Sequence, residues 1–297
     1  MYRTWVIARH TFFEAIGQPI YALLLTVSAA VLLIFMFLPF FTLGEDTVMF
    51  KAVGIDVITL LVLLATLFAT SKSIHEEIED RTMLTLMSKP VSRLEVLLGK
   101  YLGLIASTLL GIVLLGALLC LCTWYRIPAD YQLSVRSIEP RDVLQLRQLR
   151  GQHLAGLYPT LLLVWLQISV LAAISVVVST RFSLVVNLPV VILIYIAGNL
   201  TRFVDDAVAG GSPITQLFGQ AVTLVVPFLA TFDLRQYTIY GLIGFSGAEG
   251  ETASTFSRGF IWQNTALAAA YAVLYVTAIL SLGLLIFRNR ELGGSEG

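Results

Sequence analysis

Charged residues are scarce in this chain, and their scarcity excludes most classes of soluble protein. They make up 13% of the 297 residues, hydrophobic residues make up 57%, and the mean hydropathy is +0.85. Soluble domains usually carry about 25% charged residues. Lys and Arg balance Asp and Glu at 19 each, so no net positive charge attracts nucleic acid. The composition therefore predicts a membrane protein with the lipid bilayer as its surroundings and no nucleic-acid partner.

Motifs for enzymatic chemistry are also missing. No G-x-x-x-x-G-K-[ST] loop occurs, so the chain does not hydrolyse ATP by that route. Cys120 and Cys122 stand two residues apart in an apolar run, where a helix would point them to different sides, which indicates packing thiols. The run that begins His75-Glu76-Glu77 ends in Glu79, where the HExxH zinc motif needs a second histidine. We predict no catalytic site, no metal site and no directly bound cofactor.

Six apolar stretches are long enough to cross a bilayer, which takes about 20 helical residues. We predict spans at residues 20–41, 53–71, 101–125, 154–180, 182–201 and 260–287. The tight corner at residues 179–182 makes the fourth and fifth spans a helical hairpin. Residues 221–232, interrupted by Pro227, are short for a crossing, so a re-entrant or interfacial segment competes with a seventh span. The predicted fold is all-α, a single polytopic domain over residues 1–297.

The segments between the spans differ in character. Residues 1–18 repeat apolar side chains at helical spacing and predict an amphipathic helix on the membrane surface. Residues 126–153 and 202–259 are predicted external loops, the first with a short surface helix over 143–154. The loops on the side of both termini are shorter and denser in Lys and Arg, which favours a cytoplasmic location for both termini.

A few polar or small residues inside the spans have predicted packing roles. Gln167 and Asn187 are expected to hydrogen-bond between helices, and Gly99-x-x-x-Gly103 allows another helix to approach closely. Asp56 is expected to reach the interface from the start of its span. The three histidines, His10, His75 and His153, all fall outside the predicted spans.

The most charged segment, residues 73–100, lies between the second and third spans. A helix is expected to continue into water to about Met87, with an apolar stripe beside several carboxylates. Pro90 then ends it, because the residue before a proline avoids the helical conformation. Ser92 and Glu95 have the spacing of a capping box that starts the next helix. The sequence thus predicts a stiff helix–turn–helix hairpin whose apolar stripe fits a groove on a partner protein.

Three runs in this region carry a resemblance to a known family. They are Glu-Ile-Glu-Asp-Arg-Thr at 77–82, Leu-x-Leu-Met-Ser-Lys-Pro-Val-Ser-Arg at 84–93 and Leu-Leu-Gly-Lys-Tyr-Leu-Gly at 97–103. This pattern resembles the type-2 ABC exporter permeases, in which it joins the second and third spans as a coupling helix. The order of segments along the chain is similar too, although the 126–153 connection is longer than the family leads us to expect.

The resemblance implies a permease subunit in the cell membrane that works with a cytoplasmic ABC ATPase and a second permease copy or homologue. ATP and magnesium would bind on the ATPase subunit. The implied docking residues, with Ser92 and Glu95 as the cap that stiffens the hairpin, are Glu76, Glu77, Glu79, Asp80, Arg81, Thr82, Met83, Leu86, Met87, Lys89, Pro90 and Arg93.

Two other functions remain open from the residues alone. Glu76-Glu77-x-x-x-Arg81 matches an element of the intramembrane CAAX-type proteases, which also need histidines inside the membrane. An ion-coupled carrier would need charged groups in the middle of a span, and Asp56 is peripheral. Both are less favoured than the permease.

Overall fold

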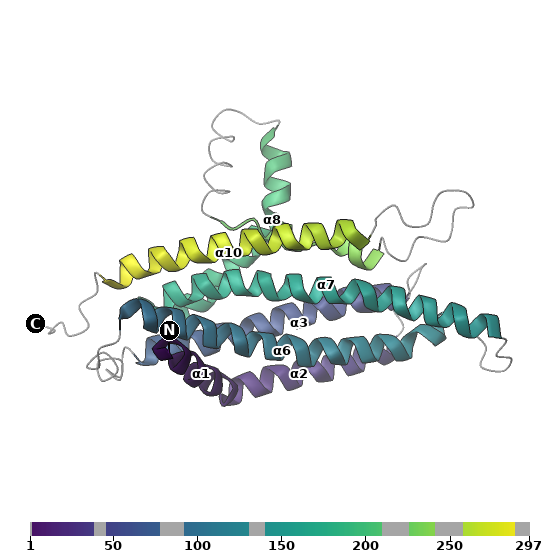
Figure 1. Ribbon diagram of the computed structural model, residues 1–297, viewed down its shortest axis with the longest axis horizontal. Coiled ribbons are helices and arrows are strands. Elements are labelled where there is room, and N and C mark those ends of the chain that lie inside the picture. The colour runs from purple at the N-terminus through teal and green to yellow at the C-terminus, as the bar shows by residue number, and fades with distance from the viewer. Residues whose placement is uncertain are drawn as a thin grey trace, which may run out of the picture.

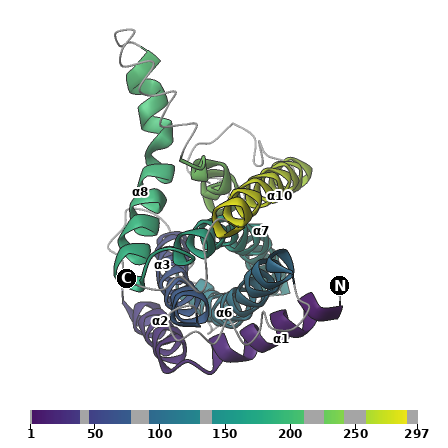
Figure 2. The ribbon, with the colours of Figure 1, turned by 90° about the vertical axis from the view of Figure 1, so that its left-hand side faces the viewer.

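The computed structural model describes residues 2–38, 46–77, 92–130, 140–209, 226–240 and 258–288. Six of its helices are long and apolar enough to cross a membrane, and no strand occurs among the described residues. The helices lie side by side along one long axis, except for α1, which crosses one end of the bundle, and the outer part of α8 (Figure 1 and Figure 2). The protein is therefore an all-α polytopic membrane protein, as predicted.

The helices follow the order of the predicted spans. In chain order they are α1 (Tyr2–Ile16), α2 (Pro19–Phe37), α3 (Asp46–Ser71), the π-helix η1 (Lys72–Glu76), α6 (Arg93–Asp130), α7 (Pro140–Ser179), α8 (Leu184–Ala209), the 3-10 helix η2 (Leu229–Phe232), the π-helix η3 (Gln236–Tyr240) and α10 (Arg258–Arg288). Pro19 and Pro140 each stand at the start of a helix, where the missing N–H costs nothing.

Two helices form the centre of the bundle. Within the candidate spans, 72% of the most apolar window of α7 and 61% of that of α3 are buried, against 17% for α2, 22% for α8 and 28% for α10. α3 and α7 therefore pack against neighbours on several sides, while the other three face outwards. The C-terminal part of α8 projects away from the other helices (Figure 2).

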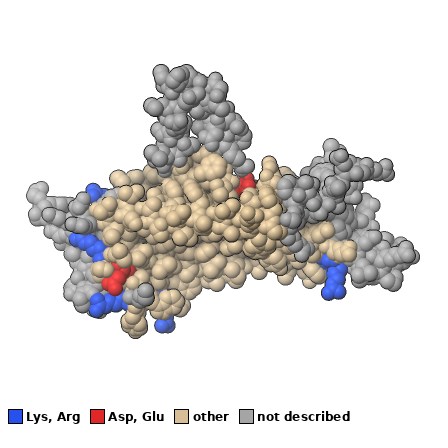
Figure 3. Space-filling model, turned by 45° about the horizontal axis from the view of Figure 1, so that its top comes forward, with Lys and Arg blue, Asp and Glu red and all other residues tan. Residues whose placement is uncertain are grey.

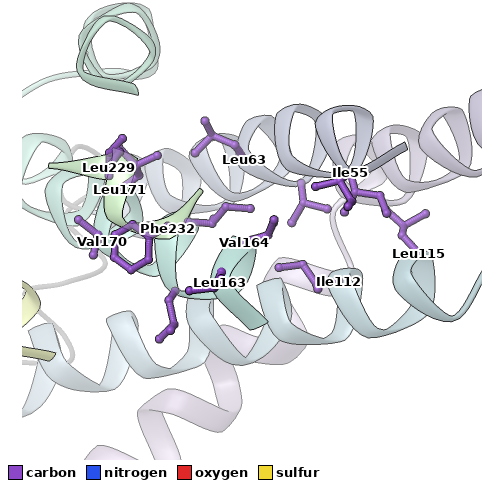
Figure 4. Close-up of a cluster of buried hydrophobic side chains, with 14 of the residues drawn as sticks. Ile55, Leu63, Ile112, Leu115, Leu163, Val164, Val170, Leu171, Leu229 and Phe232 are labelled. Carbon is purple, nitrogen blue, oxygen red and sulfur yellow. The ribbon is translucent and has the colours of Figure 1, made fainter. Parts of the chain in front are cut away.

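The apolar core runs between the central helices. Ile55 and Leu63 of α3 meet Ile112 and Leu115 of α6 and a row of side chains from α7 (Figure 4). Leu229 and Phe232 of η2 fill the space beside α7 (Figure 4). Polar contacts cross the core as well, since Thr66 of α3 and Thr108 of α6 share a hydrogen bond of 3.0 Å.

The predicted intramembrane amides do bridge helices. Asn187 of α8 donates to Ser71 Oγ at 2.9 Å and to Ser175 Oγ at 2.8 Å. Gln167 of α7 donates to Asn199 of α8 at 3.3 Å. These bonds attach the peripheral α8 to the two central helices where its apolar packing is sparse.

Both ends of the predicted 126–153 loop are helical. α6 continues to Asp130 and α7 begins at Pro140, while residues 128–149 still fall between the candidate spans Arg93–Ile127 and Arg150–Ser179. The segment 143–154 belongs to the first turns of α7 and does not form a separate surface helix. The apolar parts of α6 and α7 are already long enough to cross the membrane, and these polar turns extend the two helices beyond them. Hydropathy alone therefore ends each helix at the edge of its apolar part.

The region before α10 contains no further span among the described residues. α8 extends to Ala209, beyond the predicted end of its span. Of the proposed 221–232 segment, residues 226–232 are described, and they form a bend and the short η2. Leu229, Ala230 and Phe232 are buried against the bundle, which favours a tucked-in segment over a seventh crossing.

Candidate functional site at the base of the hairpin

The 78–91 connection joins η1 to α6, and its structure lies outside the described residues. The two ends of this connection are well defined and form what we call the hairpin base, namely Glu14, Ser73, Glu77, Glu95 and Lys100. η1 widens the last turn of α3 into a π-helix, a feature frequent at functional sites. α6 starts at Arg93 on the other side.

Ser92 and Glu95 make the reciprocal bonds of a capping box at the start of α6. The Glu95 backbone N–H donates to Ser92 Oγ at 3.2 Å, and the Ser92 backbone N–H donates to Glu95 Oε2 at 3.0 Å. Both bonds satisfy amides that the first turn of a helix leaves without partners. The entry into α6 is therefore held by local contacts.

Lys100 is the centre of the hairpin base. Its side chain is 3% exposed. The Nζ atom donates to the Ser73 carbonyl at 2.7 Å, to Ser73 Oγ at 2.9 Å and to the Glu77 carboxylate. Because a buried ammonium group is costly without partners, these contacts hold α6 and η1 in one fixed relation.

The N-terminal helix joins the same cluster. Glu14 of α1 lies 3.8 Å from Lys100 Nζ and accepts a hydrogen bond from Ser73 Oγ at 3.3 Å. At the other end of α1, the positive charge of Arg3 acts on the Glu95 carboxylate. α1 therefore touches both sides of the hairpin base, which no local sequence pattern had indicated.

Two glycines explain how α1 comes so close to α6. A Cβ atom on Gly103 would lie 2.5 Å from the Ala8 carbonyl oxygen, and one on Gly99 would lie 2.8 Å from Ile7. The Gly99-x-x-x-Gly103 spacing thus receives α1, which lies across α6 at this end of the bundle (Figure 2). The close approach predicted from the spacing is an intrachain contact.

The predicted docking residues fall into two groups. Glu79, Asp80, Arg81, Thr82, Met83, Leu86, Met87, Lys89 and Pro90 lie outside the described residues. Of the rest, Arg93 is half-buried at the start of α6, and the side chain of Glu76 is not described. Glu77 faces Lys100 inside the chain, so its carboxylate serves the hairpin base.

A second polar cluster lies at the opposite end of the bundle, which we call the far end. Arg126 donates to the carbonyls of Phe35 and Met36 at 3.0 and 2.9 Å and to that of Leu38 at 2.9 Å. Its guanidinium is also 3.9 Å from Asp46 and lies over the Phe50 ring at 5.3 Å. Arg126 therefore fixes the end of α2 and the start of α3 against α6.

Three titratable residues were placed wrongly from the sequence. Lys51, expected in the loop before the second span, lies inside α3 and is 1% exposed. His153, expected outside the spans, is buried near the start of the candidate span Arg150–Ser179, and His75, also expected outside them, is the last residue of the candidate span Asp46–His75, in η1. Lys51 lies close enough to His153 for its positive charge to act on the imidazole. Asp56, expected to reach the interface, is exposed and pairs with Arg235 at 2.6 Å.

The positions of these histidines bear on the protease alternative. His153 lies near Lys51, which stands 26 residues before Glu77, a distance of about 39 Å at 1.5 Å per residue. A histidine that distant cannot assist chemistry at Glu76 or Glu77. Among the residues that the structure describes, no group of three or more His, Cys, Asp or Glu side chains could hold a metal ion.

Most charged side chains on the face shown in Figure 3 thus lie toward the two ends of an apolar bundle, with one acidic patch partway along it. That distribution and the six spanning helices define a polytopic membrane protein. Residues 33–292 match the sequence model of the ABC-2 family transporter proteins, so the chain belongs to that family. No curated protein matches the chain.

Membership of this family makes the chain a membrane permease of an ABC transporter, a class of subunit that partners with an ATPase and often dimerises. The family match spans the hairpin, every residue of the hairpin base except Glu14, and five complete candidate spans. It therefore favours transport over the protease and carrier alternatives.

Proposed function

We propose that this permease couples ATP binding and hydrolysis on a separate cytoplasmic ATPase to export of a substrate across the cell membrane. The family match and the missing phosphate loop support a separate ATPase subunit. The hairpin base and both termini would face the cytoplasm, and the far end would face outwards. The working unit is a pair of permease chains with two ATPase subunits.

The residues 76–93 would dock on the ATPase. Glu79, Asp80 and Arg81 offer charge-assisted contacts, and Met83, Leu86 and Met87 offer an apolar stripe for a groove. Glu77 has a different part in this proposal. Because it pairs with Lys100, it would transmit force from the docked hairpin rather than touch the ATPase itself.

The observation that carries this proposal is the Lys100 cluster. A force on the hairpin acts on Glu77 and Ser92, which are attached to η1 and to α6. Lys100 joins these two elements to each other, and Glu14 adds α1 to them. The closing motion of two ATPase subunits would therefore move α3, α6 and α1 together and change the packing of the spans.

The test is purification of the tagged protein from its native membrane in mild detergent, with identification of co-purifying chains. We expect a phosphate-loop ATPase to be retained by the wild type and lost from Arg81→Glu. Arg147→Glu is the matched control, because Arg147 is an exposed arginine on α7 at the far end. Loss of the ATPase from both variants, or from neither, would contradict docking through the hairpin. If crosslinking from residues 76–93 of the intact protein also captures no ATPase, the proposed function fails.

A further inference from the structure

One face of α7 is left open along the bundle between α6 and α10, and two adjoining hollows lie along it, which we together call the groove. The α7 residues that line it recur every three or four positions, which places them on one side of a helix; they are Gly151, Leu154, Ala155, Tyr158, Leu161, Leu162 and Trp165. A hollow of about 530 Å³ lies between α6 and α7, and one of about 470 Å³ lies between α7 and α10. The Tyr158 side chain lines both hollows.

The α6–α7 part of the groove is apolar and lies toward the middle of the membrane. Val113, Ala117 and Cys120 line it from α6, opposite Leu162 and Trp165 of α7. These positions fall in the middle and outer half of the candidate spans Arg93–Ile127 and Arg150–Ser179. The Trp165 indole satisfies its own N–H by donating to the Ile105 carbonyl at 3.4 Å. The walls therefore offer hydrocarbon contact and little else.

The α7–α10 part of the groove lies at the far end and has polar character. Pro159 has no N–H, so the carbonyl of Ala155, which lines this hollow, receives no helical hydrogen bond from position 159. Trp262, which is 52% exposed, forms the opposite wall. Next to Gly151, Arg150 lies over the Trp124 ring at 4.3 Å. Aromatic rings of this kind are typical of the membrane–water interface.

We infer that this groove binds an amphiphile of the outer leaflet, with one hydrocarbon chain between α6 and α7 and a hydrogen-bond-donating headgroup between α7 and α10. The order of the two parts supports this occupant, since the polar hollow lies at the interface and the apolar one leads to the bilayer centre. An acceptor carbonyl selects a headgroup with an N–H or O–H donor. The inference also names such amphiphiles as the substrate class, and that part rests on the proposed function.

The probe is a phosphatidylethanolamine with a photoactivatable diazirine halfway along one acyl chain, added to the purified complex in nanodiscs. We expect saturable labelling of the peptide that contains residues 109–120. Phosphatidylcholine with the same chain should label less, because its headgroup has no N–H donor. Ala117→Trp fills the apolar hollow and should lower labelling about tenfold, the change that corresponds to about 1.4 kcal/mol. Leu274→Trp is the control, because it also introduces a tryptophan but at an exposed α10 position outside the groove.

Labelling that does not saturate, or that is equal in both variants, would show only annular lipid and overturn the site. Failure to label while Tyr158 crosslinks to a second copy of the chain would also overturn it. For the substrate class, unlabelled phosphatidylethanolamine should stimulate ATP hydrolysis by the wild-type complex but not by the Ala117→Trp complex. Saturable binding without stimulation would make the lipid structural and the substrate assignment wrong. If no ATPase co-purifies, the proposed function fails while the labelling result still stands.

Discussion

The hairpin base and the far end both bury a cation among helix ends, but the two cations join different things. Lys100 contacts side-chain carboxylates and a carbonyl on elements that flank the hairpin. Arg126 contacts backbone carbonyls at the end of α2. The Lys100 contacts tie α1, η1 and α6 into one unit beside the hairpin, whereas the Arg126 contacts hold the end of α2 and the start of α3 against α6. We therefore expect the hairpin base to move as a unit with a docked partner and the far end to stay anchored.

The largest effect is expected for Lys100→Met, because it leaves Glu14 and Glu77 close together without their shared cation. Removing one partner of a buried ion pair typically costs about 3 to 5 kcal/mol. Thermal unfolding in detergent measures the loss, and ATPase co-purification measures docking. Lys72→Met is the control, since Lys72 is exposed on η1, the π-helix that Lys100 contacts, and its loss should change stability by less than about 0.5 kcal/mol. Equal losses of stability in the two variants would contradict a stabilising role for the buried Lys100 contacts.

Arg126→Met tests the anchored end. The variant loses three hydrogen bonds from a charged donor to the carbonyls that end α2, and we expect about 2 to 3 kcal/mol of destabilisation. ATPase co-purification should stay at the wild-type level, because the far end does not touch the hairpin. Loss of the ATPase from a folded Arg126→Met protein would contradict the division into two ends.

Gly103→Ala separates α1 from α6 at the hairpin base. The new Cβ would lie 2.5 Å from the Ala8 carbonyl, a backbone atom that can yield only if α1 shifts. Overpacking of this kind costs about 1 to 3 kcal/mol. Gly151→Ala is the matched control, since no atom lies within 4 Å of its new Cβ, and helix propensity alone should stabilise it by up to about 1 kcal/mol. Thermal unfolding of both variants should therefore shift in opposite directions.

The smallest effect is expected for Asp56→Asn. Asp56 pairs with Arg235 at 2.6 Å, but its side chain is 57% exposed, and exposed pairs contribute about 0 to 1 kcal/mol. Thermal unfolding at low and high salt measures the pair, and the difference between variant and wild type should shrink as salt rises. A loss as large as that of Arg126→Met would show that Arg235, which directly precedes η3, anchors the far end too.

Features that depend on neighbouring residues could be predicted from the sequence. The capping box of Ser92 and Glu95 needs only two side chains three positions apart, and both of its bonds are present. The spans could be predicted because each needs about 20 apolar residues regardless of its neighbours. The docking set at 76–93 stays a prediction, since most of it lies outside the described residues.

Features that depend on contacts between distant residues could not be predicted from the sequence. Gly99-x-x-x-Gly103 predicted a close helix contact, but not that α1 would be the helix received. The sequence shows Lys100 directly before an uncharged span, but it does not predict that Glu14 and Glu77 are its partners. Lys51 and His153 looked like loop residues because hydropathy does not show how far a helix continues past its apolar part.

The sequence by itself determined that this chain crosses a membrane as six helices with a charged hairpin between the second and third, because bilayer thickness and charge burial act on each segment separately. It also carried the family resemblance. Only the tertiary structure decided which polar groups meet at the hairpin base, which helix packs against Gly99 and Gly103, and where α7 is left open. These contacts join residues that are far apart in the sequence, as Lys100 and Glu14 are, at a separation of 86 positions.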